Sequence, residues 1–454
     1  MKAIVKGLLV LLCCFSTALM GQTRSGFTKP ALFPQEMRLH LKNNQRTTAY
    51  DEGLLFLEWW QGGTYSSVQE ARIHRVCSYM KRKGYSIHKD FNALFRILNY
   101  YPEGNFSNDG LSRLLLCMEN YAVDGQNRKL KKLLKESAVV LADSMLHRSN
   151  SFQWHYNRAN INFYCDSVPI FEYQNTTLEC MSRTDRFRIE DADGLYYPLK
   201  KEFRGTAGVM DWEERFSLPS DSIYVALQNY RLDVRQSEFS ADSVWLHSLY
   251  YLDEPELGTF KQKLSAGESS RTKSFPYFRT YSNRLQLVDP FEDVDIYGGM
   301  EVSGNRFFAA SSDGSEVEFS FYKDDVPFVK GHTRRFLMRE DKLIAKDARM
   351  DLYIGGDSIW HPQVDIHYDR AKRLFRSKRI LQNMGYAPYR SSYHKLDMYF
   401  DDIEWYLDSD SLILAGDPKA SKNPVLFESS DYFSDARYRD TESQMVREDL
   451  SKYL

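Results

Sequence analysis

The spacing of apolar residues changes near residue 150, and this change constrains the fold more than any other feature of the sequence. Between residues 48 and 150, apolar side chains recur at intervals of three and four, as in the set Ile73, Val76, Cys77 and Met80. This spacing places them on one face of a helix. Turn residues such as Gly84 and Gly125 separate the sets. We therefore expect about five helices, stacked as antiparallel hairpins.

After residue 150, apolar and polar residues alternate, which is typical of half-buried strands. The clearest segments are 153–164, 222–234, 316–322, 350–354, 397–407 and 411–414. No long amphipathic helix interrupts this part before residues 441–454. The sequence predicts an α+β fold: an N-terminal helical hairpin bundle followed by a predominantly β body. The short strand cadence favours a β-solenoid, or a stacked β-roll of the jellyroll type, for that body.

Residues 1–21 have the order of charges and apolar residues that defines a secretory signal peptide. Lys2 and Lys6 precede the apolar run 7–15, and small residues lead to a cleavage site after Ala18 or Gly21. A membrane-spanning helix needs about 20 apolar residues, so this run is too short to be an anchor. Bulky residues before Cys13 and Cys14 argue against lipidation. We expect an exported protein that is periplasmic, outer-membrane-associated or secreted, with no membrane span in the mature chain.

These patterns also suggest domain boundaries. After the signal peptide, we expect a linker over 22–47, a helical domain over 48–150 and a β-rich region over 151–435. A break near 255–280 would divide the β-rich region into two subdomains. A C-terminal helical segment is expected over 436–454, and its abrupt end suggests that the chain is the N-terminal portion of a longer protein. The oligomeric state stays open.

Charge excludes one class of partner. Removing Lys2 and Lys6 with the signal peptide leaves 58 of the 60 basic side chains against 62 acidic ones, a net charge of about −4. Such a chain offers no broad basic surface, which argues against nucleic-acid binding. The 30 Tyr and 28 Phe residues fit the strand-rich C-terminal part.

Four cysteines remain after removal of the signal peptide: Cys77, Cys117, Cys165 and Cys180. None forms a C-x-x-C pair with metal or redox spacing. Export permits disulfides. A Cys77–Cys117 bridge, a Cys165–Cys180 bridge and buried free thiols are all compatible with the sequence.

Asp-Ser followed by an aliphatic residue occurs five times in the β-rich region. The serines are Ser167, Ser222, Ser243, Ser358 and Ser411. Successive rungs of a stacked sheet would produce such an echo. Asp-Ser is equally good turn chemistry before a strand, and the intervals lack a fixed period. Both interpretations stay open.

The signal ending near Gly21-Gln22, the helical head and the aromatic D-S-[VIL] segments together resemble large uncharacterised exported cell-envelope proteins of the Bacteroidota. Residues 196–246 carry most of this resemblance. It implies an envelope location and no known activity. In that group the Asp-Ser-aliphatic pattern resembles the acceptor for periplasmic O-glycosylation. The resemblance therefore makes Ser167, Ser222, Ser243, Ser358 and Ser411 candidate glycosylation sites. The cadence of the strands is also faintly similar to the β-jellyroll proteins that carry lipopolysaccharide.

One metal-site pattern is present. If residues 361–369 form a strand, Asp365, His367 and Asp369 lie at i, i+2 and i+4 and share a face. Carboxylate and imidazole groups on one face are ligands for a divalent ion. Alternatively, these three residues form the solvent side of a half-buried strand. The nucleophile-elbow, P-loop, zincin and dinucleotide motifs are absent, and no cofactor is predicted.

Charged clusters provide the other candidates. Asp211 and Glu213, like Asp402 and Glu404, stand beside a tryptophan, as glycosidase acids do beside a sugar-stacking ring. A basic run is suited to contact with an anion or a lipid and consists of Arg370, Lys372, Arg373, Arg376, Lys378 and Arg379. A second basic run consists of Arg128, Lys129, Lys131, Lys132 and Lys135. Clusters of both signs are also common as solvated faces.

We therefore expect a non-enzymatic cell-envelope scaffold or interaction protein with an envelope protein partner. The alternative is a glycan- or lipid-binding carrier, and a glycan-processing enzyme is the third hypothesis. A filled core in the β body would favour the scaffold, and an open apolar groove beside residues 370–379 would favour the carrier. Acids about 5–9 Å apart around a cleft would favour the enzyme.

Overall fold

A computed structural model describes residues 25–103, 106–157, 160–265, 274–291, 293–380, 386–393, 395–416 and 425–429. The expected signal peptide and the expected C-terminal helical segment lie outside these residues. The chain divides into two compact units. Unit 1 runs to Thr206 and includes Arg231–Ser237, and unit 2 holds Ala207–Tyr230 and the chain from Glu238 onward.

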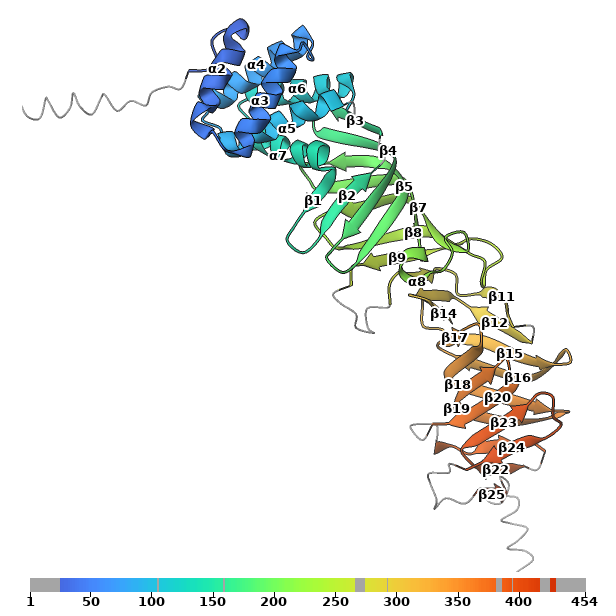
Figure 1. Ribbon diagram of the computed structural model, residues 1–454. Helices are drawn as coiled ribbons and strands as arrows, with labels where there is room; N and C mark the ends of the chain where they lie inside the picture. Colours follow the sequence, from blue (N-terminus) through green and yellow to red (C-terminus); the bar gives the residue numbers. More distant parts are fainter. Residues whose placement is uncertain are drawn as a thin grey trace, which may run out of the picture. The chain divides into compact units, whose positions relative to one another are not determined.

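Unit 1 begins with helices, as the spacing of apolar residues predicts (Figure 1). They are η1 (Pro30–Leu32), α2 (Phe33–Leu41), η2 (Lys42–Asn44), α3 (Thr48–Gln61), α4 (Ser67–Arg82), η3 (Ile87–Phe91), α5 (Asn92–Tyr100), η4 (Tyr101–Glu103), α6 (Asn108–Val123) and α7 (Asn127–Asp143). The N-terminal ends of α3, α4 and α6 are capped by the side chains of Thr47, Ser66 and Ser107. Each cap satisfies a backbone N–H that has no partner within its helix.

The described part of the expected linker 22–47, residues 25–47, instead contributes to the helical core. Phe33, Met37 and Leu41 on α2 are fully buried. Their spacing at i, i+4 and i+8 puts them on one face of the helix. The ring of Phe33 lies 4.9 Å from that of Trp60 on α3, measured between centroids. The linker prediction was wrong because this short stripe was not recognised as helical.

The strands of unit 1 follow the helices directly. They are β1 (Met145–Arg148), β2 (Gln153–Asn157), β3 (Asn160–Cys165), β4 (Pro169–Met181), β5 (Arg186–Tyr197) and the start of β6 (Glu202–Asp211). β4 pairs antiparallel with β2, β3 and β5. Tyr156 on β2 donates a hydrogen bond of 2.6 Å to the carbonyl of Val140 on α7. The helices and first strands therefore pack as one unit, and the main division of the chain falls near residue 206 instead of residue 150 or 255–280.

A disulfide joins Cys117 on α6 to Cys165 at the end of β3, with 5.9 Å between the Cα atoms. Cys77 and Cys180 are buried free thiols. Neither bridge considered from the sequence forms. The observed pair connects the helical part of unit 1 to its sheet, across the periodicity change at residue 150.

In its described residues, unit 2 is antiparallel β structure with one short helix, α8 (Glu213–Phe216). Its strands up to β17 are β7 (Ile223–Asp233), β8 (Glu238–Ser248), β9 (Glu256–Lys263), β10 (Tyr277–Thr280), β11 (Leu285–Phe291), β12 (Val294–Gly298), β13 (Met300–Ser303), β14 (Arg306–Ala309), β15 (Val317–Lys323), β16 (Val326–Thr333) and β17 (Phe336–Met338). The later strands are β18 (Lys342–Ile354), β19 (Asp357–Asp369), β20 (Leu374–Arg379), β21 (Tyr389–Ser391), β22 (Leu396–Tyr399), β23 (Asp402–Tyr406), β24 (Leu412–Ala415) and β25 (Leu426–Ser429). The protein is thus α+β, a helical region followed by a β body, as predicted.

Two ladders run through unit 2 and share long strands. One passes through β9, β10, β13, β14 and β17, and the other through β11, β12, β15 and β16. β18 joins both, because its first half pairs with β17 and its second half with β16. β19 likewise pairs with β20 at one end and with β21 at the other. All of these pairings are antiparallel, as in the predominantly β body that the sequence predicts.

The long strands bend at single residues with left-handed backbone geometry. Such residues occur in β4, β5, β7, β8 and β18, and they are Asn175, Asp191, Asn229, Ser243 and Asp347. Asn and Asp tolerate positive φ better than other residues with a side chain. The ladder registers of β4–β5, β8–β9 and β18–β19 shift at these positions, as a β-bulge requires. The bulges allow one strand to serve two ladders.

The interior between the ladders is filled by aromatic rings. Phe321 lies 5.4 Å from Tyr368 and 5.6 Å from Phe375, measured between ring centroids. Phe328 reaches Trp405 at 5.1 Å. Edge-to-face packing of this kind adds to the stabilisation that burial supplies.

The Asp-Ser-aliphatic echo has two structural settings. In four cases the Asp-Ser pair lies in the turn before a strand or begins it, at β4, β7, β19 and β24. In the fifth, Ser243 is the bulge residue within β8. Turn chemistry therefore accounts for most of the echo.

Candidate functional site

Three sets of charged residues chosen from the sequence lie on neighbouring strands of unit 2. β20 pairs with β19 on one side and with β23 on the other. Arg376 therefore stands opposite His367 and Glu404, and Lys378 stands opposite Asp365 and Asp402. Two candidate metal ligands, two residues of the basic run and the acids of β23 are thus cross-strand neighbours, whereas Asp211 and Glu213 lie apart from them, on β6 and α8.

The candidate metal ligands have other partners. Asp365 accepts a hydrogen bond of 3.2 Å from the backbone N–H of Asp347, the bulge residue of β18. The pKa of His367 is lowered by burial, and neighbouring cations including Arg376 add to that effect. Among the residues that the structure describes, no group of three His, Cys, Asp or Glu side chains is arranged to hold a metal ion.

The pattern around these ligands is that of a half-buried strand. Val364, Ile366 and Tyr368, which alternate with them, are buried. Asp365, His367 and Asp369 form the outer side of β19. The alternative that the sequence left open, a solvent-facing polar side, accounts for all three residues.

The basic run is largely neutralised by acids on neighbouring segments. Arg376 reaches Glu404 at 2.5 Å, and Arg379 reaches Asp401 at 3.1 Å. Arg373 pairs with Asp408 at 3.2 Å, and Lys372 lies 3.9 Å from Asp369. The sequence presented the basic run and the acids of β23 as separate features, and the ladder register brings them together as ion pairs.

The candidate glycosidase acids stand beside tryptophans that are already engaged. Trp212 is fully buried, and its indole N–H donates to the carbonyl of Gly304 at 2.9 Å. Trp405 donates to the carbonyl of Ser409 at 3.0 Å and packs against Phe328. Asp211 accepts the backbone N–H of Glu213. A sugar ring cannot stack on Trp212, because no face of its indole reaches solvent.

The five candidate glycosylation serines all reach the surface. Ser167, Ser243 and Ser411 are exposed, while Ser222 and Ser358 are half-buried. Surface access is what a glycosyl acceptor needs, so these sites stay predictions that the fold permits.

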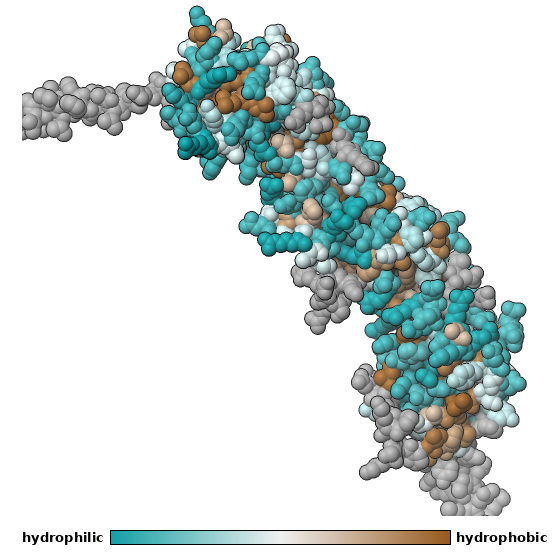
Figure 2. All heavy atoms as spheres, viewed as in Figure 1, coloured by the Kyte–Doolittle hydropathy of each residue, from teal (hydrophilic) through white to brown (hydrophobic). Residues whose placement is uncertain are grey.

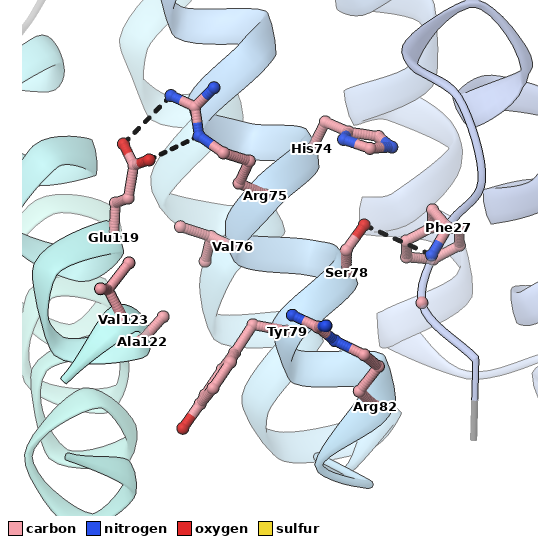
Figure 3. Close-up of a pocket in the computed structure, with 11 residues that line it drawn as sticks. Phe27, His74, Arg75, Val76, Ser78, Tyr79, Arg82, Glu119, Ala122 and Val123 are labelled. Atoms are coloured by element: carbon pink, nitrogen blue, oxygen red, sulfur yellow. Dashed lines mark hydrogen bonds and ion pairs between the residues drawn. The ribbon is translucent and has the colours of Figure 1, made fainter. Parts of the chain in front are cut away.

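A pocket of about 470 Å³ lies between α4 and α6 (Figure 3). The guanidinium of Arg75 turns toward Glu119 and binds it at 2.5 Å. Ser78 turns toward Phe27 and accepts its backbone N–H at 3.3 Å. The pKa of His74 is lowered, mainly by burial. Both of these pairs join residues of the pocket's own lining.

A second cavity, of about 800 Å³, lies between α7 and the η3–α5 segment. Four residues of the second basic run line it, namely Arg128, Lys131, Lys132 and Lys135. Lys89 and Arg96 line it from η3 and α5. The sequence identified the basic run on α7. It did not identify Lys89 and Arg96, which are about 40 residues away and meet the run only after the helices pack.

Comparison of the chain with protein-family models, with curated proteins and with solved structures finds no match.

Proposed function

We propose that this chain is an exported, non-enzymatic scaffold or interaction protein of the bacterial cell envelope. The observation that carries the proposal is the set of ion pairs that joins β20 to the acids at β23, next to β19. The charged residues best suited to chemistry in unit 2 neutralise one another there instead of facing an open site. A body built in this way is suited to holding a shape.

The packing of unit 2 supports the same proposal. A carrier of lipid needs an open apolar groove, whereas Phe321, Phe328 and Phe375 fill the interior beside the basic run. Filled aromatic cores of this kind stabilise a fixed architecture.

Exposed apolar residues support an interaction role. Ile413 on β24 and Leu426 and Phe427 on β25 are 46–49% exposed. Figure 2 shows hydrophobic residues gathered at the end of unit 2 that carries these strands, against a mostly hydrophilic visible face. In the described part of the chain, β24 and β25 each pair with one neighbour only. Strands with an open edge and apolar side chains are suited to partner binding.

The envelope location rests on residues 1–21, whose order of charged, apolar and small residues is that of a signal peptide. Within the described residues, no helix is long and apolar enough to cross a membrane.

One observation favours a glycan-binding protein as the second candidate. On the outer face of β7 and β8, the rings of Tyr224 and His247 stack 4.5 Å apart. Trp245 lies two residues before His247, so it shares that face, and it is 38% exposed. Exposed flat rings are suited to stacking on sugars.

The test is expression of the full chain, with residues 1–21, in a Gram-negative host, followed by cell fractionation and chemical crosslinking. The proposal expects recovery from the envelope without residues 1–21, in a crosslinked complex of fixed stoichiometry. Asp402→Asn and Glu404→Gln should leave that complex intact. Retention in the cytoplasm with an intact N-terminus would overturn the envelope assignment. Glycan turnover that these two variants abolish would overturn the non-enzymatic one. Trp245→Ala tests the glycan-binding alternative. Only that alternative predicts that the substitution abolishes sugar binding.

A further inference from the structure

The cavity between α7 and the η3–α5 segment combines cations from two walls. Arg128, Lys131, Lys132 and Lys135 occupy successive turns of α7, spanning about 10 Å along the helix. Lys89 and Arg96 come from the opposite wall. The apolar part of the lining is made of small residues, Ala93, Ala138 and Val139. The result is a shallow, positively charged groove of about 800 Å³.

The acids at this groove are already paired. Asp90 lies 3.6 Å from Lys131. Glu136 is buried and forms an ion pair with Lys201. Asp143 accepts from Arg96 at 2.5 Å. Each of these carboxylates therefore compensates one cation and has little negative charge left for its neighbours.

Four cations remain uncompensated. Lys89, Arg128 and Lys135 are exposed, and none forms an ion pair with any residue that the structure describes. Lys132 donates a hydrogen bond of 2.5 Å to the carbonyl of Leu199, a neutral group, so its charge is also uncompensated. Like charges that converge on one concave surface raise the local positive potential, and a multivalent anion relieves their repulsion.

The mixture of lysine and arginine at the groove favours a phosphate-containing ligand over a carboxylate. Planar carboxylates are recognised best by the two-pronged guanidinium of arginine, and Arg128 is the one arginine among these four cations. Lysine ammonium groups bind phosphate as point charges, from several directions at once. Three lysines on two walls, with one arginine, suit an anion whose charge is distributed over more than one tetrahedral group.

We propose that the groove between α7 and the η3–α5 segment binds a ligand that carries two or more phosphate groups, either a free phosphorylated saccharide or the headgroup of a phosphorylated lipid. This site lies in unit 1, away from the residues of β19, β20 and β23 on which the proposed function rests. A failure here would leave the scaffold proposal standing.

The experiment measures binding of inorganic tripolyphosphate to the mature full-length chain by isothermal titration calorimetry at two salt concentrations. A triple variant, Lys89→Ala, Arg128→Ala and Lys135→Ala, removes three of the four uncompensated cations. We expect this variant to weaken tripolyphosphate binding at least tenfold. The affinity should also depend less on salt concentration, because fewer ionic contacts form and fewer counterions are released on binding. The three side chains are exposed, so the thermal unfolding midpoint should not move.

A matched control removes the same number of charges elsewhere. Lys346→Ala, Lys372→Ala and Lys378→Ala take three exposed lysines from unit 2 and should leave the affinity within about twofold, since only screened long-range attraction is lost. Equal weakening by both triple variants would mean non-specific attraction and would overturn the site. Unchanged binding by the unit 1 variant would overturn it as well.

A vesicle arm identifies the source of the phosphate. The chain is floated with vesicles of phosphatidylcholine that contain or lack cardiolipin, whose headgroup carries two phosphates. Flotation that depends on cardiolipin and on Lys89, Arg128 and Lys135 assigns the groove to a lipid headgroup. Tripolyphosphate binding without flotation assigns it to a free ligand. Failure of both probes to bind overturns the proposal.

Discussion

Several residues of types that often bind metals or catalyse reactions instead stabilise the fold of this protein. Asp365 accepts the N–H of a bulge residue, and Trp212 donates to a buried carbonyl. His361 belongs to the same group. It is fully buried, its Nε2 lies 2.9 Å from the carbonyl of Ala387, and its Nδ1 accepts the N–H of Gln363 at 3.0 Å. Because a carbonyl only accepts, Nε2 carries the proton and the ring is neutral.

The buried ring of His361 should make stability depend on pH. Burial lowers its pKa from 6.5 to about 4. The unfolded chain then binds a proton more readily than the folded one. The contribution of the neutral His361 ring to the free energy of unfolding is present in full above pH 6.5. It falls as the pH drops from 6.5 to 4 and is constant below pH 4. The loss should be a few kcal/mol at most.

The measurement is urea unfolding at pH 7.5 and pH 4.5, for the wild type and for His361→Gln. The variant should lose less stability between the two pH values, because it lacks the titrating ring. His88→Gln, at an exposed position, provides the control and should follow the wild type. Equal pH dependence of His361→Gln and the wild type would contradict the assignment.

At the scale of elements, the bulge is the device on which the β body depends. It recurs in hairpins of both units. Asn175 on β4 donates its N–H to Asp193 at 2.7 Å, and Asp347 on β18 donates its N–H to Asp365 at 3.2 Å. In each case the side chain of an Asp on the partner strand accepts the backbone N–H of the bulge residue, which has no partner in the ladder.

Substitution at Asp347 should separate backbone geometry from side-chain chemistry. Its φ is 50°, where a β-branched residue is strained. We expect Asp347→Val to destabilise unit 2 by about 1–3 kcal/mol, and Asp347→Gly to cost under about 1 kcal/mol because glycine adopts this φ without strain. Chemical denaturation of the three proteins checks the order. Equal losses for Val and Gly would show that the carboxylate matters more than the backbone.

At the scale of the whole molecule, the boundary between the two compact units does not coincide with the change in hydrophobic period near residue 150. The helices and β1–β5 belong to one unit, tied by the Cys117–Cys165 disulfide and by the buried pair of Glu136 and Lys201. A change in hydrophobic period marks where secondary structure changes. It does not mark which elements pack together, because both kinds of element bury a face against a common core.

Removal of the disulfide should therefore weaken unit 1 as a whole. The cross-link closes a loop with a sequence separation of 48 residues. The double variant Cys117→Ala, Cys165→Ala should lose about 2–4 kcal/mol, mostly because the unfolded chain gains freedom. The helical signal in circular dichroism and the tryptophan fluorescence of unit 1 should still change in a single transition. Separate transitions would contradict the single unit.

The free thiols provide an internal control. Burial raises the pKa of Cys77 and of Cys180, so neither should react with iodoacetamide in the native protein. The native mature chain should take up no label, and reduction should add a label at the half-buried Cys165 and not at Cys117, which is 1% exposed. Labelling of Cys77 before unfolding would show that the helical core opens.

Local patterns in the sequence determined the elements of this protein. The stripe Ile73, Val76 and Met80 specified α4, and the alternation Val364, Ile366 and Tyr368 specified the buried face of β19. These are interactions between near neighbours in the chain, so their spacing is visible without a fold. The residues 128–135 were visible as a basic run for the same reason.

Pairing between distant residues was decided by the tertiary structure alone. Only the ladder register places Arg376 against Glu404, and only helix packing brings Lys89 and Arg96 to the groove beside α7. The partner of Cys117 was likewise set by the packing of α6 on β3. Long-range contacts depend on how elements bury their apolar faces against one another. Many arrangements bury similar area, and side-chain complementarity selects among them.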